Sequence, residues 1–124
     1  MRIIGAIIDE PIDLENAQIR CEVWLDHCQF NENVTFARAN FAGGLLFDGS
    51  RFKEEANFNG MKVGDKISFR QAIFEGPVGF VGGDIASNFE AVGAKFKNKK
   101  KTASFNSMKV ARSNGNRSSN ASGI

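Results

Sequence analysis

Large apolar residues recur along this chain in steps of five and six residues. Phenylalanine occupies positions 36, 41, 47 and 52, and the same stepping continues on both sides. Of the eighteen anchor positions this defines, seventeen are Phe, Ile, Leu or Val, and they include ten of the 12 phenylalanines. The anchors are Ile3, Ile8, Leu14, Ile19, Leu25, Phe30, Phe36, Phe41, Phe47, Phe52, Phe58, Val63, Phe69, Phe74, Phe80, Ile85, Ala91 and Phe96. The chain is therefore an internal repeat with a period of eleven residues.

A second set of positions lies two residues before the anchors and alternates between bulky and small side chains. The bulky members are Ile12, Val23, Val34, Leu45, Ala56, Ile67, Val78 and Phe89, and the small ones are Ala6, Ala17, Cys28, Ala39, Ser50, Ala72, Gly83 and Ala94, with Met61 as the exception. On a helix, at about 100° per residue, these positions would fall on two opposed faces. Residues two apart lie on the same side of a strand. Each unit is thus predicted to be a very short strand followed by a corner.

The corners and the wrap follow from the same spacing. Seven glycines lie two positions after an anchor, where a corner favours a residue that tolerates positive φ: Gly5, Gly43, Gly49, Gly60, Gly76, Gly82 and Gly93. Four sides that close into a square use two of the eleven-residue periods, and these two periods make one coil. With coils about 4.8 Å apart, phenylalanines separated by one coil can stack inside the solenoid. The predicted core ladder is Leu14, Ile19, Leu25, Phe30, Phe36, Phe41, Phe47, Phe52, Phe58, Val63, Phe69, Phe74, Phe80, Ile85 and Phe96.

The segments FARANF and FDGSRF resemble the pentapeptide-repeat family, in which a central Phe or Leu follows a small residue two places earlier. The opening LDHCQF and the six-residue spacers resemble its looser, Phe-rich branch. The match covers about residues 3–96 and returns, shifted by three, at Ala103, Phe105, Met108 and Val110. The resemblance implies an all-β, right-handed, quadrilateral parallel β-helix of about four to five coils. It implies little about activity.

Charge divides the 124 residues unevenly. Residues 1–96 carry 9 Lys or Arg and 14 Asp or Glu, a net charge of −5, whereas residues 97–124 carry 7 Lys or Arg and no acidic residue. We expect a β-helix over 1–96, a basic loop over 97–101, a final partial coil over 102–110 and a disordered polar tail over 111–124. Lys97, Lys99, Lys100 and Lys101 belong either to a solvated loop or to a contact with an anionic partner. Nucleic acid is not expected, because no aromatic residues are interleaved with these lysines.

Candidate chemistry is sparse. The only histidine, His27, lies near Cys21 and Cys28, but three ligands fall short of the usual four for zinc, and Cys28 is predicted to point inward. Adjacent carboxylates such as Glu54 and Glu55 point in different directions on a strand or corner and do not form an acid–base pair. No phosphate-binding glycine motif is present. We therefore expect no cofactor, no metal and no enzymatic activity.

Three functions remain open: a non-catalytic protein-interaction or scaffold solenoid, a DNA mimic that binds and protects a topoisomerase, and an enzyme. The first is favoured because a solenoid offers broad faces and no deep pocket. The second is a role known for some relatives in the resembling family and needs an acidic rod. No segment is long and apolar enough to span a bilayer, and a cytoplasmic protein is expected. We also hypothesise a homodimer, through the first coil at Ile3, Ile8 and Leu14 or the last coil at Phe105 and Val110.

Overall fold

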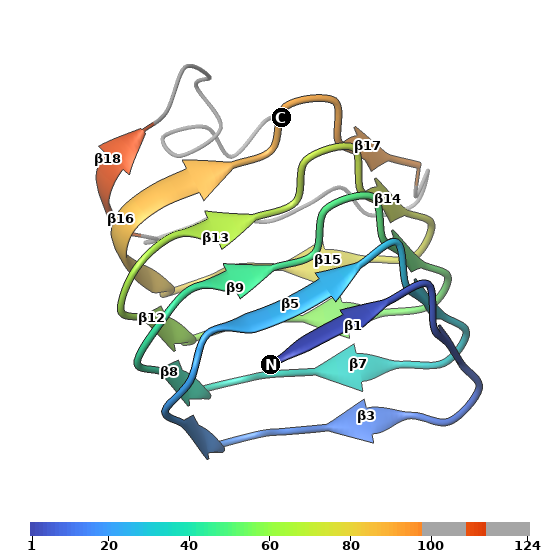
Figure 1. The fold of residues 1–124 in the computed structure, drawn as a ribbon, viewed down its shortest axis with the longest axis horizontal. Helices are drawn as coiled ribbons and strands as arrows, with labels where there is room; N and C mark the ends of the chain where they lie inside the picture. The colour runs from blue at the N-terminus through green and yellow to red at the C-terminus, as the bar shows by residue number, and fades with distance from the viewer. Residues whose placement is uncertain (98–108, 114–124) are drawn as a thin grey trace.

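The computed structural model describes residues 1–97 and the backbone of Lys109–Ser113. These residues form an all-β, right-handed solenoid of about four turns with four sides (Figure 1). One side contains β1 (Arg2–Ile4), β5 (Val23–Asp26), β9 (Leu45–Leu46), β13 (Ile67–Ser68) and the end of β16 (Asp84–Glu90). The second contains β2 (Ile7–Ile8), β6 (Gln29–Phe30), β10 (Arg51–Phe52), β14 (Ile73–Phe74) and β17 (Lys95–Phe96). The third contains β3 (Ile12–Asp13), β7 (Val34–Thr35), β11 (Ala56–Asn57) and β15 (Val78–Gly79), and the fourth contains β4 (Gln18–Ile19), β8 (Asn40–Phe41), β12 (Lys62–Val63) and the start of β16.

Each strand pairs in parallel with the strand at the same position in the neighbouring coil. Phe52 stands opposite Phe30 in the preceding coil and Phe74 in the following one, each two repeat periods away in the sequence. The third and fourth sides keep the same separation, as in the pair Val34 and Ala56. The predicted coil of two eleven-residue periods is therefore confirmed. Among the described residues, no helix has the length and apolarity needed to cross a membrane.

Two of the four corners in each coil turn through a residue with positive φ. These residues recur every eleven positions: Gly5, Asn16, His27, Arg38, Gly49, Gly60, Gln71, Gly82 and Gly93. Most form the third residue of a hydrogen-bonded four-residue turn, as where the Ser50 N–H donates to the Phe47 carbonyl at 3.1 Å. This is the arrangement of a type II turn.

Two of the seven corner glycines do not have the predicted positive φ. Gly43 and Gly76 lie at the two corners of the coil that do not use a positive φ, and the backbone of neither is in the left-handed region. At Gly76, a Cβ atom would lie 2.5 Å from the carbonyl carbon and oxygen of Glu54 in the preceding coil. Glycine is required there because two backbones approach closely, and not because of the local dihedral angle.

The interior is filled by stacked aromatic rings. Phe30, Phe52, Phe74 and Phe96 form one column, with ring centroids 4.8, 4.9 and 5.0 Å apart. Phe36, Phe58 and Phe80 form a second column, with spacings of 5.5 and 5.0 Å, and Phe47 stacks on Phe69 at 5.3 Å. Phe89 fills the space next to the small anchor Ala91 and packs edge-on against Phe80 at 5.4 Å. The core is therefore continuous through the coils.

Core residues in the end coils are less buried than those in the middle. Leu14 is 38% exposed, and Ile19 and Phe96 are only partly buried. Leu14 and Ile19 are more exposed because, among the described residues, another coil covers the first coil on one side only. Met61, the one large residue at a position where the repeat otherwise has small side chains, is fully buried.

The chain crosses a corner without a break in β16. Asp84 pairs with Lys62 of β12, and Phe89 pairs with Ile67 of β13, so β16 joins two sides into one sheet. Its outer edge pairs in parallel with β18 (Lys109–Ser113), where Val110 stands opposite Ile85. The sequence separation of this pair exceeds one coil by three residues. The strand extends to Ser113, beyond the start of the predicted polar tail, and the other residues between 98 and 124 lie outside the described part.

Candidate interaction face

One side of the solenoid carries a partly apolar line of outward residues. Parallel pairing aligns Arg2 with Trp24, Trp24 with Leu46, Leu46 with Ser68 and Ser68 with Glu90. Neighbouring residues in each strand point into the core, because side chains alternate along a strand. We call the outward line Arg2, Trp24, Leu46, Ser68 and Glu90 the Trp24 face.

Trp24 lies at the centre of the apolar part of this face. The Arg2 guanidinium carbon is 4.6 Å from the centroid of the indole ring, a cation–π contact. The indole Nε1–H donates to Glu22 Oε1 at 2.6 Å, which fixes the ring orientation. Leu46, next in line, is only 4% exposed although it points outward. Trp24 itself remains partly exposed and can contact another molecule.

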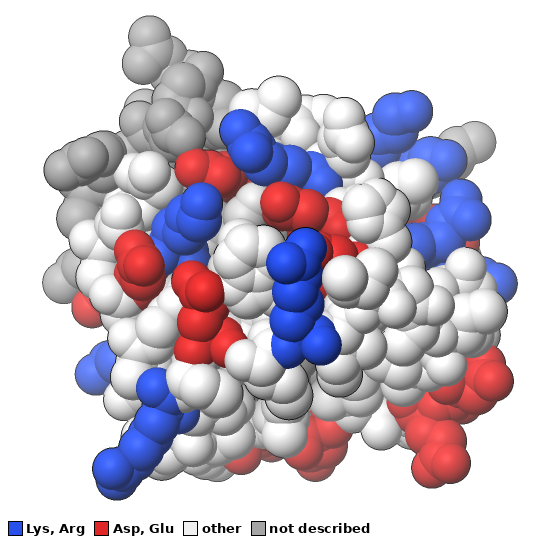
Figure 2. All heavy atoms as spheres, viewed as in Figure 1, with Lys and Arg blue, Asp and Glu red and all other residues white. Residues whose placement is uncertain are grey.

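Charges of both signs surround Trp24 and Leu46. Arg2 forms an ion pair with Asp26 at 3.2 Å, and Arg70 forms one with Glu90 at 3.7 Å. Figure 2 shows positive and negative side chains interspersed over this side. In both pairs the guanidinium is exposed and the carboxylate is largely buried, and the mixed charge pattern sets which partner surface is complementary.

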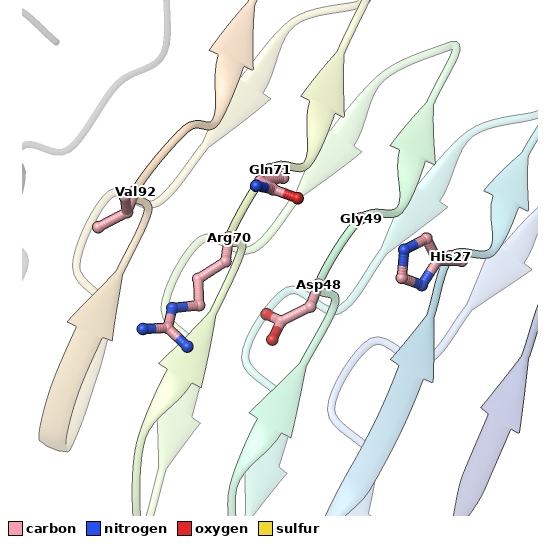
Figure 3. A pocket seen from close by; sticks show the side chains of 6 residues that line it. All are labelled: His27, Asp48, Gly49, Arg70, Gln71 and Val92. Carbon is pink, nitrogen blue, oxygen red and sulfur yellow. The ribbon is translucent and has the colours of Figure 1, made fainter.

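A polar hollow of about 370 Å³ adjoins the Trp24 face at the corner after β5, β9 and β13. It is lined by His27, Asp48, Gly49, Arg70, Gln71 and Val92. Figure 3 shows that these residues come from successive coils, with the His27 ring beside Gly49. A Cβ atom at Gly49 would lie 2.7 Å from Cδ2 of His27, so the missing side chain makes room for the imidazole.

The hollow can bind polar groups. Its imidazole, carboxylate, guanidinium and amide side chains donate and accept hydrogen bonds, and Asp48 Oδ1 already accepts one from Ser68 Oγ. Within the described ranges, no group of three or more His, Cys, Asp or Glu could hold a metal ion. Cys28 is buried with its Sγ 3.5 Å from the Asp26 carbonyl oxygen, whereas Cys21 is exposed. The two thiols therefore face in the directions that the repeat predicts.

A different corner gathers carboxylates. The turns between the second and third sides carry the exposed residues Asp9, Glu10, Glu32, Glu54 and Glu55 on three successive coils. Acidic side chains gather at the lower right of Figure 2, where the chain passes from β2 to β3. Lys53 lies in the same row of turns, so the row is acidic but not uniformly so. The adjacent pairs at 9–10 and 54–55 are surface groups.

The basic residues considered as contacts to an anionic partner fall mostly outside the described part. Lys97 is exposed, and its backbone N–H donates to the Phe74 carbonyl at 2.8 Å. Lys99, Lys100 and Lys101 lie outside the described residues. The Trp24 face was not predicted from the sequence, although its members at 2, 24, 46, 68 and 90 are each separated by one coil length. Applying the coil length to the outward positions would have placed these residues in one row, but it would not have marked that row as a binding face.

Comparisons with known proteins gave one result. Residues 3–51 match the family model described as "Pentapeptide repeats (9 copies)". No curated protein and no solved structure matches the chain. The matched segment covers the first two coils and the start of the third, and the pairing described above continues the same coil to Phe96.

Proposed function

We propose that this chain, of which residues 3–51 match the pentapeptide-repeat model, is a pentapeptide-repeat protein throughout its solenoid and a non-catalytic interaction module that docks a protein partner on the Trp24 face. The partner would bring an apolar pocket for the indole ring and charges that complement the mixed charges around it. Interfaces of this kind have a small desolvated centre and a polar rim.

The single observation that carries the proposal is the exposed part of Trp24 beside the covered Leu46. Tryptophan and arginine are among the residues most enriched in binding hot spots. Here they occur as a stacked pair, since Arg2 lies over the indole ring. On the third and fourth sides, the outward strand residues of the described coils are polar or glycine. The Trp24 face is therefore the side best suited to bind a protein.

Affinity capture from a native lysate tests this proposal with two matched variants. Trp24→Ala removes the centre of the face, and Ile73→Ala removes another outward, partly exposed apolar side chain on the second side. We expect a protein that is retained by the unchanged chain and by Ile73→Ala but lost with Trp24→Ala. With the purified partner, Trp24→Ala should weaken binding by at least about 30-fold. Equal capture by all three proteins would count against this face.

The acidic corner supports an alternative, a DNA mimic that binds a topoisomerase. Its carboxylates are stacked along the solenoid axis, as phosphates are along a duplex. The size of the negative charge argues against mimicry. Four coils span about 20 Å, and duplex DNA of that length carries about 12 negative charges. Residues 1–96 have a net charge of only −5. A supercoiling assay separates the two functions. Inhibition or protection of a topoisomerase that is lost with Glu32→Lys and kept with Trp24→Ala would favour mimicry.

A further inference from the structure

The first coil leaves the core open at one end. A hollow of about 370 Å³ is lined by thirteen residues, all of them apolar residues or cysteine. Its rim includes Ile3 and Leu14, which are each 38% exposed, and Met1, which is 62% exposed. Deeper in the hollow lie core residues of the second coil such as Phe30 and Phe36. Large apolar side chains gathered in one exposed patch indicate a contact surface.

We propose that a second copy of this chain covers this hollow, with the two first coils stacked end to end about a two-fold axis. This inference is independent of the Trp24 face, which lies along the side of the solenoid. The two ends are equal in size and shape, so each closes the other's core without leaving part of it uncovered. A two-fold contact of this kind is the commonest arrangement of oligomers.

The size of the coil end is sufficient for a dimer. A coil of about 22 residues at about 3.3 Å per residue has a perimeter of about 70 Å, and a square of that perimeter encloses about 300 Å². With the side chains of the rim, two such ends bury about 1,000 Å² or slightly more, which is the lower range for a specific interface. The interface is small, so its apolar centre must supply most of the affinity.

The strand edges also fit this partner. Each of β1 to β4 pairs with one coil only, so its other edge has free backbone donors and acceptors among the described residues. Turning a copy over about a two-fold axis reverses its strand direction. Strands that meet across the interface are then antiparallel, and they can form hydrogen bonds in the ladder of an antiparallel pair.

Charges on the rim distinguish between the two axes that pass through opposite corners of the coil. Asp9 and Glu10 occupy the corner after β2, and Arg20 occupies the diagonally opposite corner after β4. An axis through the other two corners, after β1 and β3, places Arg20 of each copy against Asp9 and Glu10 of the second copy. The remaining rim carboxylates already have partners: Glu15, on this axis, pairs with Arg38, and Glu22, beside Arg20, accepts a hydrogen bond from the Trp24 indole. An axis through the corners after β2 and β4 would instead bring Asp9 and Glu10 against the same carboxylates, which is repulsive.

The same axis brings the exposed anchors onto their counterparts. It places the first side of one copy over the second side of the other, so Ile3 meets Ile8, and it places Leu14 over Ile19. Ile8 and Ile19 are only partly buried in the single chain. The contact therefore completes the burial of all four anchors of the first coil.

Sedimentation velocity of the 124-residue chain, at about 1–100 µM, tests this arrangement. The unchanged chain should form a dimer, and Leu14→Arg should weaken the dimer by at least about 30-fold. Val81→Arg is the matched control, because Val81 is also 38% exposed but lies on a side corner of the fourth coil; it should leave the dimer unchanged. Circular dichroism establishes that each variant is folded.

Charge reversal tests the axis without changing the core. Arg20→Glu should weaken the dimer by about 10-fold, and adding Asp9→Lys and Glu10→Lys to it should restore the affinity. Trp24→Ala should not alter sedimentation, which separates this inference from the proposed docking face. A chain that is monomeric over the whole concentration range would overturn the proposal. So would a dimer that is insensitive to both Leu14→Arg and Arg20→Glu, because it would form through another surface.

Discussion

The ring of Phe52 should be among the largest single contributors to stability. Phe52 is 1% exposed, and its ring stacks on Phe30 at 4.8 Å and on Phe74 at 4.9 Å, with interplanar angles of 10° and 5°. A buried phenylalanine removes at least about 150 Å² of surface from water, which corresponds to about 4 kcal/mol at about 25 cal/mol per Å². Phe52→Ala would also leave a cavity between two coils. We expect the free energy of unfolding to fall by about 3–5 kcal/mol.

Equilibrium urea unfolding, followed by circular dichroism, measures this loss. Lys53→Ala is the control, since it removes an exposed side chain at the adjacent position and should change the free energy of unfolding by less than about 0.5 kcal/mol. Phe52→Leu keeps an apolar side chain in the column and should cost about 1–2 kcal/mol, which provides a measurement even where the alanine variant fails to fold. Equal losses for Phe52→Ala and Lys53→Ala, or a loss below about 1.5 kcal/mol for Phe52→Ala, would refute the stacked column.

Two further predictions concern the corner glycines and the two thiols. Gly49→Ala and Gly82→Ala both place a side chain at positive φ (+68° and +73°), which should lower the free energy of unfolding by about 1–2 kcal/mol. Only the new methyl group at position 49 also meets the His27 ring. Thermal melts should therefore show an additional loss of stability of about 1 kcal/mol for Gly49→Ala. That excess should vanish in a His27→Ala background, and equal losses with His27 present would contradict the packing at this corner. A thiol reagent should label Cys21 rapidly and Cys28 only on unfolding; two rapidly reacting thiols in the native protein would be the opposite result.

The inward positions were predictable because their pattern is local and periodic. Strand alternation places residues two apart on one side, and the five–six stepping then requires two eleven-residue periods in each four-sided coil. The column through Phe30, Phe52 and Phe74 and the opposite directions of Cys21 and Cys28 follow from that arithmetic. Because every coil has the same length, residues separated by one coil length in the sequence lie next to each other in the structure.

The interaction face could not be recognised in the same way. Outward residues do not share a chemical type, so Arg2, Trp24 and Leu46 show no periodic pattern although they are spaced by one coil. The corner glycines also needed the structure, because glycine is used there for two reasons. At Gly49 the backbone has positive φ, whereas at Gly76 the carbonyl of Glu54 leaves no room for a Cβ atom.

By itself, the sequence determined the coil length, the four sides and the stacked core, since each depends on a hydrophobic period that every coil repeats. Only the tertiary structure decided where Trp24 meets Arg2, where the His27 ring covers Gly49 and how far the first coil leaves Ile3 and Leu14 exposed. These features depend on side-chain directions and on what covers a given coil. A period is identical in every coil, but the contacts above, below and outside each coil are not, and these contacts give the surface its binding properties.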